Sequence, residues 1–343
     1  MKYVFVKGVH FGNKGAELMF LAIKQELDGM RDDIRLVLAP GAQSTFERRM
    51  EHQAYQLFNL AKGKHDFNGT GRFVPARVRT FLRQRFGIVF EVDLSAILDV
   101  SGFAYGDNWP LENSSRAYRQ AARLRSGGGK YIFMPQAFGP FARQQERDSM
   151  KAALDASHAA YARDQISHDY LAQMGIDLPI VEDFTSVVKP ATDGARCGLM
   201  IVPNSNMLRG KKGWTREFYL DTVVRIARSF HAATGEPVSV MNHEGPSDQQ
   251  VSEELHALID TQIGTGALIV PCDALEAKRA IAGSRLVFAS RYHACISALA
   301  SGVVCLGTSW SHKYEELYKG YGVEALLIDA EAGHAVEQTV HDT

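Results

Sequence analysis

Apolar and polar positions along the chain alternate in an order that predicts strands followed by helices. Residues 3–6 form a short apolar run, and the apolar positions of residues 15–27 then recur at helical spacing. Further short apolar runs lie at residues 36–39, 96–100 and 131–134. Strands that alternate with helices are typical of α/β proteins with a parallel sheet. The first half of the chain therefore predicts one doubly wound domain.

The second half repeats this alternation after a polar stretch at residues 189–196 (KPATDGAR), whose Pro and Gly are typical of a linker. Apolar runs predict strands at residues 197–202, 237–241, 267–270, 286–289, 303–306 and 325–328, and amphipathic segments predict helices at residues 216–233, 247–263, 274–282 and 313–321. At 343 residues the chain exceeds what one core usually supports. We expect an α/β protein with two Rossmann-like, doubly wound domains, residues 1–188 and 197–343, facing across a cleft in a glycosyltransferase-B-like arrangement.

Composition and charge narrow the class of protein. Lys plus Arg number 38 and Asp plus Glu 39, so the net charge of -1 gives no reason to expect a nucleic-acid partner. The four cysteines are scattered without a Cys-x-x-Cys pair, which favours a reduced, cytoplasmic chain. The first apolar run ends at Lys7 with no cleavage site after it, so it reads as a strand rather than a signal peptide. No cluster has metal-ligand spacing, so we expect no structural zinc, and a divalent cation bound with phosphate stays open.

Residues 70–87 interleave five arginines with phenylalanine, valine and leucine and predict a basic amphipathic helix. One interpretation is contact with a membrane surface, such as the inner face of the membrane where a lipid-linked acceptor would lie. The other is a solvated helix that packs its aromatic side inward. Basic surface helices are common, so we favour the second.

Several predicted strands of the second half end in polar residues, at 204–206, 242–244, 291–293 and 309–313. Because the carboxyl ends of parallel strands lie at one edge of a sheet, these residues should converge. An arginine fork suits a carboxylate or phosphate and a histidine can transfer a proton near neutral pH, so Arg291 and His293 are the leading candidates. Asn204, His243, His312 and Lys313 are further candidates, and a purely structural role stays open for the two histidines.

Loops of the first half also follow predicted strands. The glycine-containing loop 12–15 offers Asn13, with Glu17 just beyond it, to an anion or a sugar hydroxyl at a helix start, although a tight turn without a ligand explains it equally well. Loops 101–107 and 135–140 contain Asp107 and Gln136. These two side chains could donate or accept hydrogen bonds to a sugar, or simply cap helices.

Short motifs in both halves resemble the polysaccharide pyruvyl transferase family. Residues 285–307 (RLVFASRYHACISALASGVVCLG) resemble its C-terminal signature, with RYHA at 291–294 where the family has Arg-Leu-His-Ala. Tyr292 and Val304 replace the usual Leu and Pro, which leaves the ionisable groups in place. The loop at 12–17, the turn at 135–140 and the Arg-Asp-x-x-Ser stretch at 163–167 resemble further family elements.

The resemblance implies a reaction and a set of residues. The family transfers the enolpyruvyl group of phosphoenolpyruvate, a co-substrate rather than a cofactor, onto two hydroxyls of a sugar in a cell-surface polysaccharide or exopolysaccharide, or in its precursor. A pyruvate ketal forms and phosphate is released. Arg163, Arg291, Tyr292 and His293 would bind phosphoenolpyruvate, with His293 as general acid, and first-domain loops would meet the acceptor. An ion pair between Arg163 and Asp164 is the structural alternative.

Two other classes stay open. The first is a glycosyltransferase of the same architecture with a nucleotide-sugar donor; the spacing of Glu316 and Glu324 resembles the paired acids of such enzymes, but the pair lies after the glycine-containing helix rather than before it. The second is a non-catalytic carbohydrate-binding protein, which the departures from the family pattern at Ala16, Phe103 and Tyr292 favour.

Overall fold

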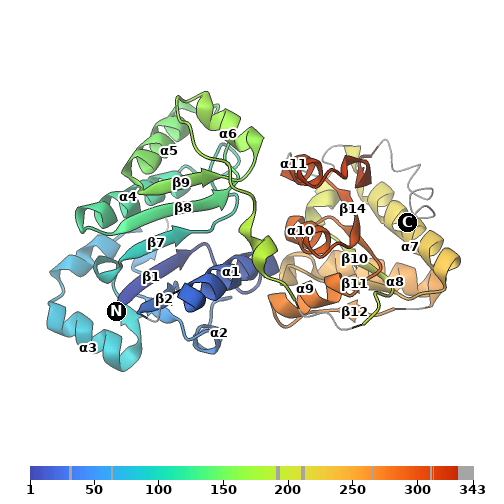
Figure 1. Cartoon of the computed structure of the whole chain (residues 1–343), viewed down its shortest axis with the longest axis horizontal. Coiled ribbons are helices and arrows are strands. Elements are labelled where there is room, and N and C mark those ends of the chain that lie inside the picture. The colour runs from blue at the N-terminus through green and yellow to red at the C-terminus, as the bar shows by residue number, and fades with distance from the viewer. Residues whose placement is uncertain are drawn as a thin grey trace. The chain divides into compact units, whose positions relative to one another are not determined.

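The computed structural model describes residues 1–30, 33–62, 65–190, 194–209, 213–264, 266–309, 311 and 313–330. By its internal contacts the chain divides into two compact units (Figure 1). The first comprises Met1–Phe11 and Met19–Phe184, and the second Gly12–Leu18 and Thr185–Thr343. A short N-terminal segment that the sequence assigns to the first domain therefore makes most of its contacts with the second unit. Of the expected linker, residues 191–193 lie outside the described ranges.

The first unit is built on a seven-stranded sheet in the order β6-β3-β2-β1-β7-β8-β9, and each of its strand pairs is parallel. The strands are β1 (Lys2–Lys7), β2 (Ile34–Leu38), β3 (Tyr55–Leu57), β6 (Ile88–Val89), β7 (Ala96–Asp99), β8 (Lys130–Gln136) and β9 (Ala159–Ala162), with a separate antiparallel pair of β4 (Ala61–Lys62) and β5 (His65–Asp66). The chain starts at β1, moves outward to one edge, and returns to continue at β7. The order thus reverses between β1 and β7, which is where ligands bind in such sheets.

The helices of the first unit follow the predicted alternation. They are α1 (Lys14–Met30), α2 (Phe46–Glu51), α3 (Ala76–Phe86), α4 (Glu112–Ser126), α5 (Gln144–Ala156) and α6 (Gln165–Ala172). Apolar residues of α4, Ala117, Ala121 and Leu124, pack into the core under the sheet because their spacing puts them on one face of the helix.

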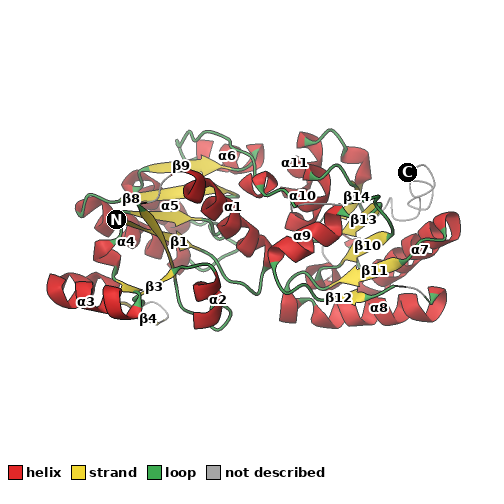
Figure 2. Cartoon of the chain, turned by 60° about the horizontal axis from the view of Figure 1, so that its bottom comes forward, coloured by secondary structure: helices red, strands yellow, loops and turns green. Residues whose placement is uncertain are grey.

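The second unit contains a six-stranded parallel sheet in the order β12-β11-β10-β13-β14-β15, shown edge-on in Figure 2. Its strands are β10 (Leu199–Val202), β11 (Val238–Met241), β12 (Leu268–Ile269), β13 (Leu286–Ala289), β14 (Val304–Thr308) and β15 (Leu327–Ile328). Its helices are α7 (Arg216–Thr234), α8 (Gln249–Ile263), α9 (Ala274–Ala282), α10 (Tyr292–Ala300) and α11 (Lys313–Gly320). The order reverses between β10 and β13, and both strands are buried along their whole length, as central parallel strands are. Two doubly wound α/β units are therefore confirmed.

The basic segment of residues 70–87 differs from the interpretation that we favoured. Its helix α3 has no buried residue, and Phe73, Phe81 and Phe86 are 72%, 59% and 59% exposed. The expectation that its aromatic side packs inward is wrong, because the helix is held by ion pairs of Arg79 and Arg83 with Asp93 instead. Across the described ranges, no helix has the length and apolarity that a bilayer crossing requires.

Candidate active site

The carboxyl ends of β10 and β13 are tied together at Ser290, the residue after β13. The side-chain amide of Asn204 donates to the Ser290 carbonyl at 2.9 Å, and the Tyr314 hydroxyl donates to the same oxygen at 2.8 Å. The Ser290 hydroxyl lies 2.8 Å from the Tyr219 hydroxyl and 2.6 Å from that of Thr308. Asn204, a predicted site residue, is thus a buried tie between the loops that follow the two central strands. This network fixes the backbone from which α10 starts.

Arg291 is the N-cap residue of α10, and its guanidinium is bound by two carboxylates. Nε donates to Oδ2 of Asp248 at 2.6 Å and Nη2 donates to Oδ1 at 2.5 Å, a bidentate contact, while Nη1 forms an ion pair with Glu244. The side chain of Arg291 is 15% exposed and that of Asp248 is fully buried. Burial raises the pKa of Asp248 to about 6 and lowers the pKa of Arg291 to about 10, so it works against both charges, and hydrogen bonds from Ser205 oppose the rise in the pKa of Asp248.

Arg291, which the sequence predicts to bind an anionic substrate, is therefore already paired with two carboxylates of the protein. One guanidinium facing two carboxylates leaves an excess negative charge at this point. An anionic ligand could reach the guanidinium only by taking the place of one carboxylate. Glu244 is the more exposed of the two, with a side chain that is 20% accessible.

His243 follows β11 at its carboxyl end and is buried. Its Nε2 makes no hydrogen bond to any residue in the described ranges. Burial, the largest cause, and the nearby Arg291, His293 and Lys14 side chains together lower the pKa of His243 to about 3. The imidazole is therefore neutral near pH 7, and its unsatisfied nitrogen is available to a ligand atom.

The loop before α1 joins the same group of residues. Asn13 caps the helix: its Oδ1 accepts from the backbone N–H of Gly15 at 2.9 Å and of Ala16 at 3.2 Å. Its Nδ2 donates to Oε1 of Glu244 at 3.0 Å. The cap thus links the start of α1 to the end of β11, within the second unit.

Two side chains of the first turn of α1 complete this corner. Lys14 donates to the Cys272 carbonyl at 3.0 Å and forms an ion pair with Glu17 at 3.5 Å, and both side chains are almost wholly buried. Glu17, a predicted site residue, therefore faces a lysine.

Gly15 shows how closely α1 approaches α10. A Cβ atom at this position would lie 2.0 Å from Nδ1 of His293 and 2.5 Å from its Cγ, closer than atoms can pack. Only glycine fits here, so the imidazole of His293 lies against the backbone of the first turn of α1. We refer to the residues gathered at this edge as the switch-point cluster: Asn13, Lys14, His243, Glu244, Asp248, Arg291 and His293.

Two other predicted residues of the second unit lie on the next part of α10 and on α11. Tyr292 is buried in the core, with its ring edge-to-face with that of Tyr314 at 5.6 Å. The Lys313 ammonium stands 4.9 Å from the centre of the Tyr292 ring. His312 lies outside the described residues. A role of these residues in binding stays a prediction.

Arg163, the remaining predicted anion-binding residue, lies in the first unit directly after β9. Its Nη1 donates to Oδ2 of Asp183 at 3.1 Å, and its side chain is 2% exposed. Its sequence neighbour Asp164 caps α6, accepting from the Ser167 N–H at 2.7 Å. A ligand of Arg163 would have to replace or extend the contact with Asp183.

Gln136 is the last residue of β8, and Asp107 lies in the loop after β7. Gln136 is buried at the end of β8; its Nε2 donates to the Asp99 carbonyl at 3.5 Å, and its Oε1 has no hydrogen-bond partner in the described part of the chain. Asp107 accepts from the backbone N–H and from Nε of Arg143, at 3.2 and 3.0 Å, just before α5. Asp107 thus stabilises a turn at the start of a helix, which agrees with the capping alternative. The side-chain oxygen Oε1 of Gln136, in contrast, accepts no hydrogen bond from the described residues.

The order reversal of the first sheet carries a different cluster. The Lys7 ammonium lies 3.0 Å from Oδ2 of Asp99, which also accepts from the hydroxyls of Tyr105 and Tyr131, each at 2.5 Å. The Ser101 hydroxyl donates to the other carboxylate oxygen at 2.6 Å. Burial alone would raise the pKa of Asp99, but the Lys7 charge and these donors hold it below its ordinary value. One cation, one anion and a full set of donors make this cluster balanced.

Sequence reasoning did not single out Asp248, Glu244 or Lys14. Asp248 precedes α8, and an aspartate there is normally interpreted as a helix cap. In the structure its side chain makes no capping bond and turns to Arg291 instead. Glu244 was noted only as part of a polar strand end. A search for carboxylates in the loops after strands near the one that precedes Arg291 could have found both residues.

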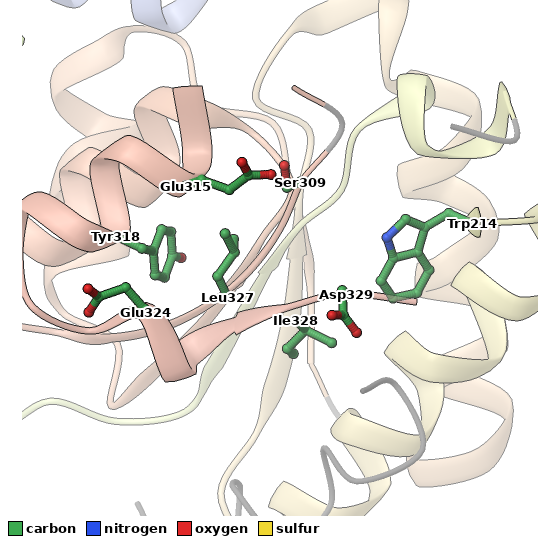
Figure 3. Close-up of a pocket in the computed structure, with 8 residues that line it drawn as sticks. All are labelled: Trp214, Ser309, Glu315, Tyr318, Glu324, Leu327, Ile328 and Asp329. Carbon is green, nitrogen blue, oxygen red and sulfur yellow. The ribbon is translucent and has the colours of Figure 1, made fainter. Parts of the chain in front are cut away.

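A cavity of about 350 Å³ lies elsewhere in the second unit, beyond the ends of β14 and β15 (Figure 3). Trp214 lines one side, and Tyr318 and Glu324 line the other (Figure 3). Glu315 and Asp329 also line it, so three carboxylates are among the described residues of its walls. Across the described ranges, no group of three or more histidine, cysteine, aspartate or glutamate side chains is placed to hold a metal ion.

Solved structures share this fold of two doubly wound α/β units. A candidate UDP-N-acetylglucosamine 2-epimerase from Listeria monocytogenes is 12% identical, with a TM-score of 0.61, covering 100% of this chain and 88% of that one. The UDP-GlcNAc 2-epimerase of Methanocaldococcus jannaschii is 12% identical, with a TM-score of 0.59 over 100% and 93% of the two chains. The HepE protein of Anabaena, solved with UDP and glucose, is 13% identical, with a TM-score of 0.52 over 100% and 97%. At these identities the likeness establishes the glycosyltransferase-B-like fold class alone.

The family follows from the sequence. The polysaccharide pyruvyl transferase family model matches residues 13–312, a span that runs from Asn13 of the switch-point cluster past α10. This chain belongs to the polysaccharide pyruvyl transferase family, and the resemblance seen in its short motifs is confirmed. A search of curated proteins gave no match.

Proposed function

We propose that this protein transfers the enolpyruvyl group of phosphoenolpyruvate onto two hydroxyls of a saccharide, forming a cyclic pyruvate ketal and releasing phosphate. The observation that carries the proposal is the family match from residue 13 to residue 312, together with the switch-point cluster, whose residues all lie within the matched span. Strongly shifted pKa values and an unsatisfied buried histidine at a strand-order reversal are typical of functional sites.

The reaction sets the protons that the site must move. One sugar hydroxyl adds to C2 of phosphoenolpyruvate while the methylene carbon takes up a proton and becomes a methyl group. The second hydroxyl then replaces phosphate at C2. The two hydroxyls lose two protons: one balances the methyl group and the other leaves with phosphate. A general acid and an anion-binding group are therefore both required.

His293 is the proposed general acid, because its imidazole lies at the start of α10 against the first turn of α1. Arg291 is the proposed anchor for the substrate carboxylate. That carboxylate has the same planar shape as the glutamate group now paired with Nη1 of Arg291, so it can take the place of Glu244 while Asp248 keeps its bidentate contact. Lys14 and the free Nε2 of His243 are suited to the phosphate.

The acceptor is proposed to contact loops of the first unit. Gln136 supports this part of the proposal, because its buried Oε1 accepts no hydrogen bond from the described residues and is suited to accept one from a sugar hydroxyl. Arg163 would contribute by exchanging Asp183 for an anion. The identity of the sugar does not follow from any of these contacts.

The decisive experiment incubates the purified protein with phosphoenolpyruvate and a panel of saccharides. Mass spectrometry should detect an acceptor that has gained a ketal-linked pyruvate, and phosphate release should depend on that acceptor. Calorimetry with phosphoenolpyruvate and with uridine or guanosine diphosphate sugars separates the alternative glycosyltransferase function. Binding of a nucleotide sugar without binding of phosphoenolpyruvate would overturn the proposal, and binding of neither with retained saccharide binding would point to a non-catalytic role.

A further inference from the structure

Helix α3 of the first unit presents a row of basic and aromatic side chains to solvent. Arg77, Phe81 and Arg85 are four residues apart, so they lie on one side of the helix, with Val78 next to them. All four are exposed, Phe81 by 59%. We call them the α3 outer face. In both Figure 1 and Figure 2 α3 lies at an outer edge of the first unit.

The opposite row of α3 attaches the helix to the unit. Nε of Arg79 lies 3.1 Å from each carboxylate oxygen of Asp93, and Nη1 of Arg83 lies 3.7 Å from Oδ2. Since no residue of α3 is buried, the apolar side chains of the outer face contribute nothing to the core. Apolar side chains that lie together on an exposed helix face are available for contact with a partner.

The charge of the outer face indicates what that partner is. Residues 70–87 contain five arginines and no acidic residue. Among the described residues, Arg77 and Arg85 have no ion pair, whereas Arg79 and Arg83 do. Helix α2 shows the contrast: it also exposes apolar residues, but Glu47 and Glu51 accompany its arginines.

We propose that the α3 outer face docks the protein on a membrane surface that contains anionic lipid. A short helix with arginines beside phenylalanine and valine lies in the plane of the interface, with the apolar side chains among the headgroups and the guanidinium groups on lipid phosphates. With an overall charge of -1, the chain has no general attraction to anions, so the contact is local to α3.

A second copy of the chain is a poorer occupant of the same face. In a twofold contact the same patch meets itself, which would place Arg77 and Arg85 of one copy against those of the other. The outer face has no acidic residue to offset that repulsion. The lipid surface supplies the negative charge that self-association lacks.

The test is vesicle flotation of the full-length protein at low and high salt, without substrate, so that its result is independent of the proposed reaction. Vesicles of phosphatidylcholine alone are compared with vesicles of equal parts phosphatidylcholine and phosphatidylglycerol. The protein should bind the second kind, and binding should weaken as salt rises. Arg77→Gln with Arg85→Gln should weaken the partition coefficient by about 25-fold, since each basic residue at such a surface contributes about fivefold.

Matched variants separate docking from general effects. Phe81→Ser should also lower binding, whereas Val270→Ser, at a second-unit residue that is 64% exposed, should not. Arg209→Gln with Arg228→Gln, two exposed arginines of the second unit, controls for lost charge. Unchanged melting temperatures show that every variant is folded.

Three results would overturn the proposal. The first is no binding to anionic vesicles, and the second is equal loss in the control variants. The third is a concentration-dependent dimer that Phe81→Ser dissolves, seen by light scattering without lipid, which would assign the face to a second copy of the chain. Loss of vesicle binding only in the α3 variants supports docking.

Discussion

The two sheets reverse their strand order at equivalent places, and the charges there are arranged in opposite ways. In the first unit, Asp99 faces one cation, Lys7, and three hydroxyl donors. In the second, Arg291 faces two carboxylates, and a buried histidine nitrogen lacks a partner. Perturbed pKa values and unsatisfied buried groups gather at functional sites, whereas a balanced pair is typical of a structural contact. The edge of the second unit is therefore the proposed site of the reaction.

The largest expected effect concerns His293, the proposed acid at this edge. His293→Ala should lower the rate of pyruvyl transfer by about 10²- to 10⁴-fold, the usual contribution of a general acid, with phosphoenolpyruvate affinity largely kept. Steady-state kinetics and calorimetry measure the two quantities separately. Near-normal turnover of the variant would remove this residue from the mechanism.

Equivalent substitutions of the two buried aspartates test the comparison directly. Asp99→Asn should lower the free energy of unfolding by about 3 kcal/mol, because it leaves Lys7 without a counter-charge. Asp248→Asn should cost less, because Glu244 still pairs with Arg291 and burial already disfavours the charge of Asp248. Urea titrations of both variants provide the values.

The same pair of variants should separate in binding. Asp248→Asn removes one negative charge beside the guanidinium of Arg291, so the affinity of that variant for anionic phosphoenolpyruvate should rise, whereas Asp99→Asn should leave the affinity unchanged where it folds. Equal stability losses with no gain in binding would show that the second cluster is as structural as the first.

Gly15 tests the close approach of α1 to His293. Gly15→Ala places a methyl group where the imidazole lies, so either the ring or the helix start must move. Turnover should fall by about 100-fold, the cost of a misplacement of about 1 Å in a catalytic geometry. Gly29→Ala in the same helix is the control, because its Cβ would meet no atom within 4 Å. Similar turnover of the two variants would contradict the inferred packing.

The alternation of apolar runs and helical segments was enough to predict the fold class and most elements, including α9 with the bounds seen in the structure. Convergence of strand ends also brought His243, Arg291 and His293 together correctly. The sequence could not show which carboxylates meet Arg291, because Asp248 is 43 residues away and occupies an ordinary cap position. Nor could it show that the start of α1 belongs with the second unit, since one helix spans both. Phe81 is exposed because the opposite side of α3, with Arg79, contacts Asp93. The periodicity of the sequence does not show which side of the helix makes that contact.

The effect that is absent at neutral pH and develops only in acid concerns the pH dependence that His243 adds to the second cluster. Its pKa of about 3 in the folded protein lies below its ordinary value of 6.5, so the unfolded chain binds one more proton between these limits. Stability from this residue is therefore complete above about pH 6.5 and is lost as the pH falls towards 3, by up to about 1.4 kcal/mol per pH unit. His243→Asn should remove this slope, and urea titrations of wild type and variant at several pH values should diverge accordingly. Parallel stability curves would mean that the pKa of His243 is the same in the folded and the unfolded chain, and the neutral, buried imidazole inferred for the second cluster would then be wrong.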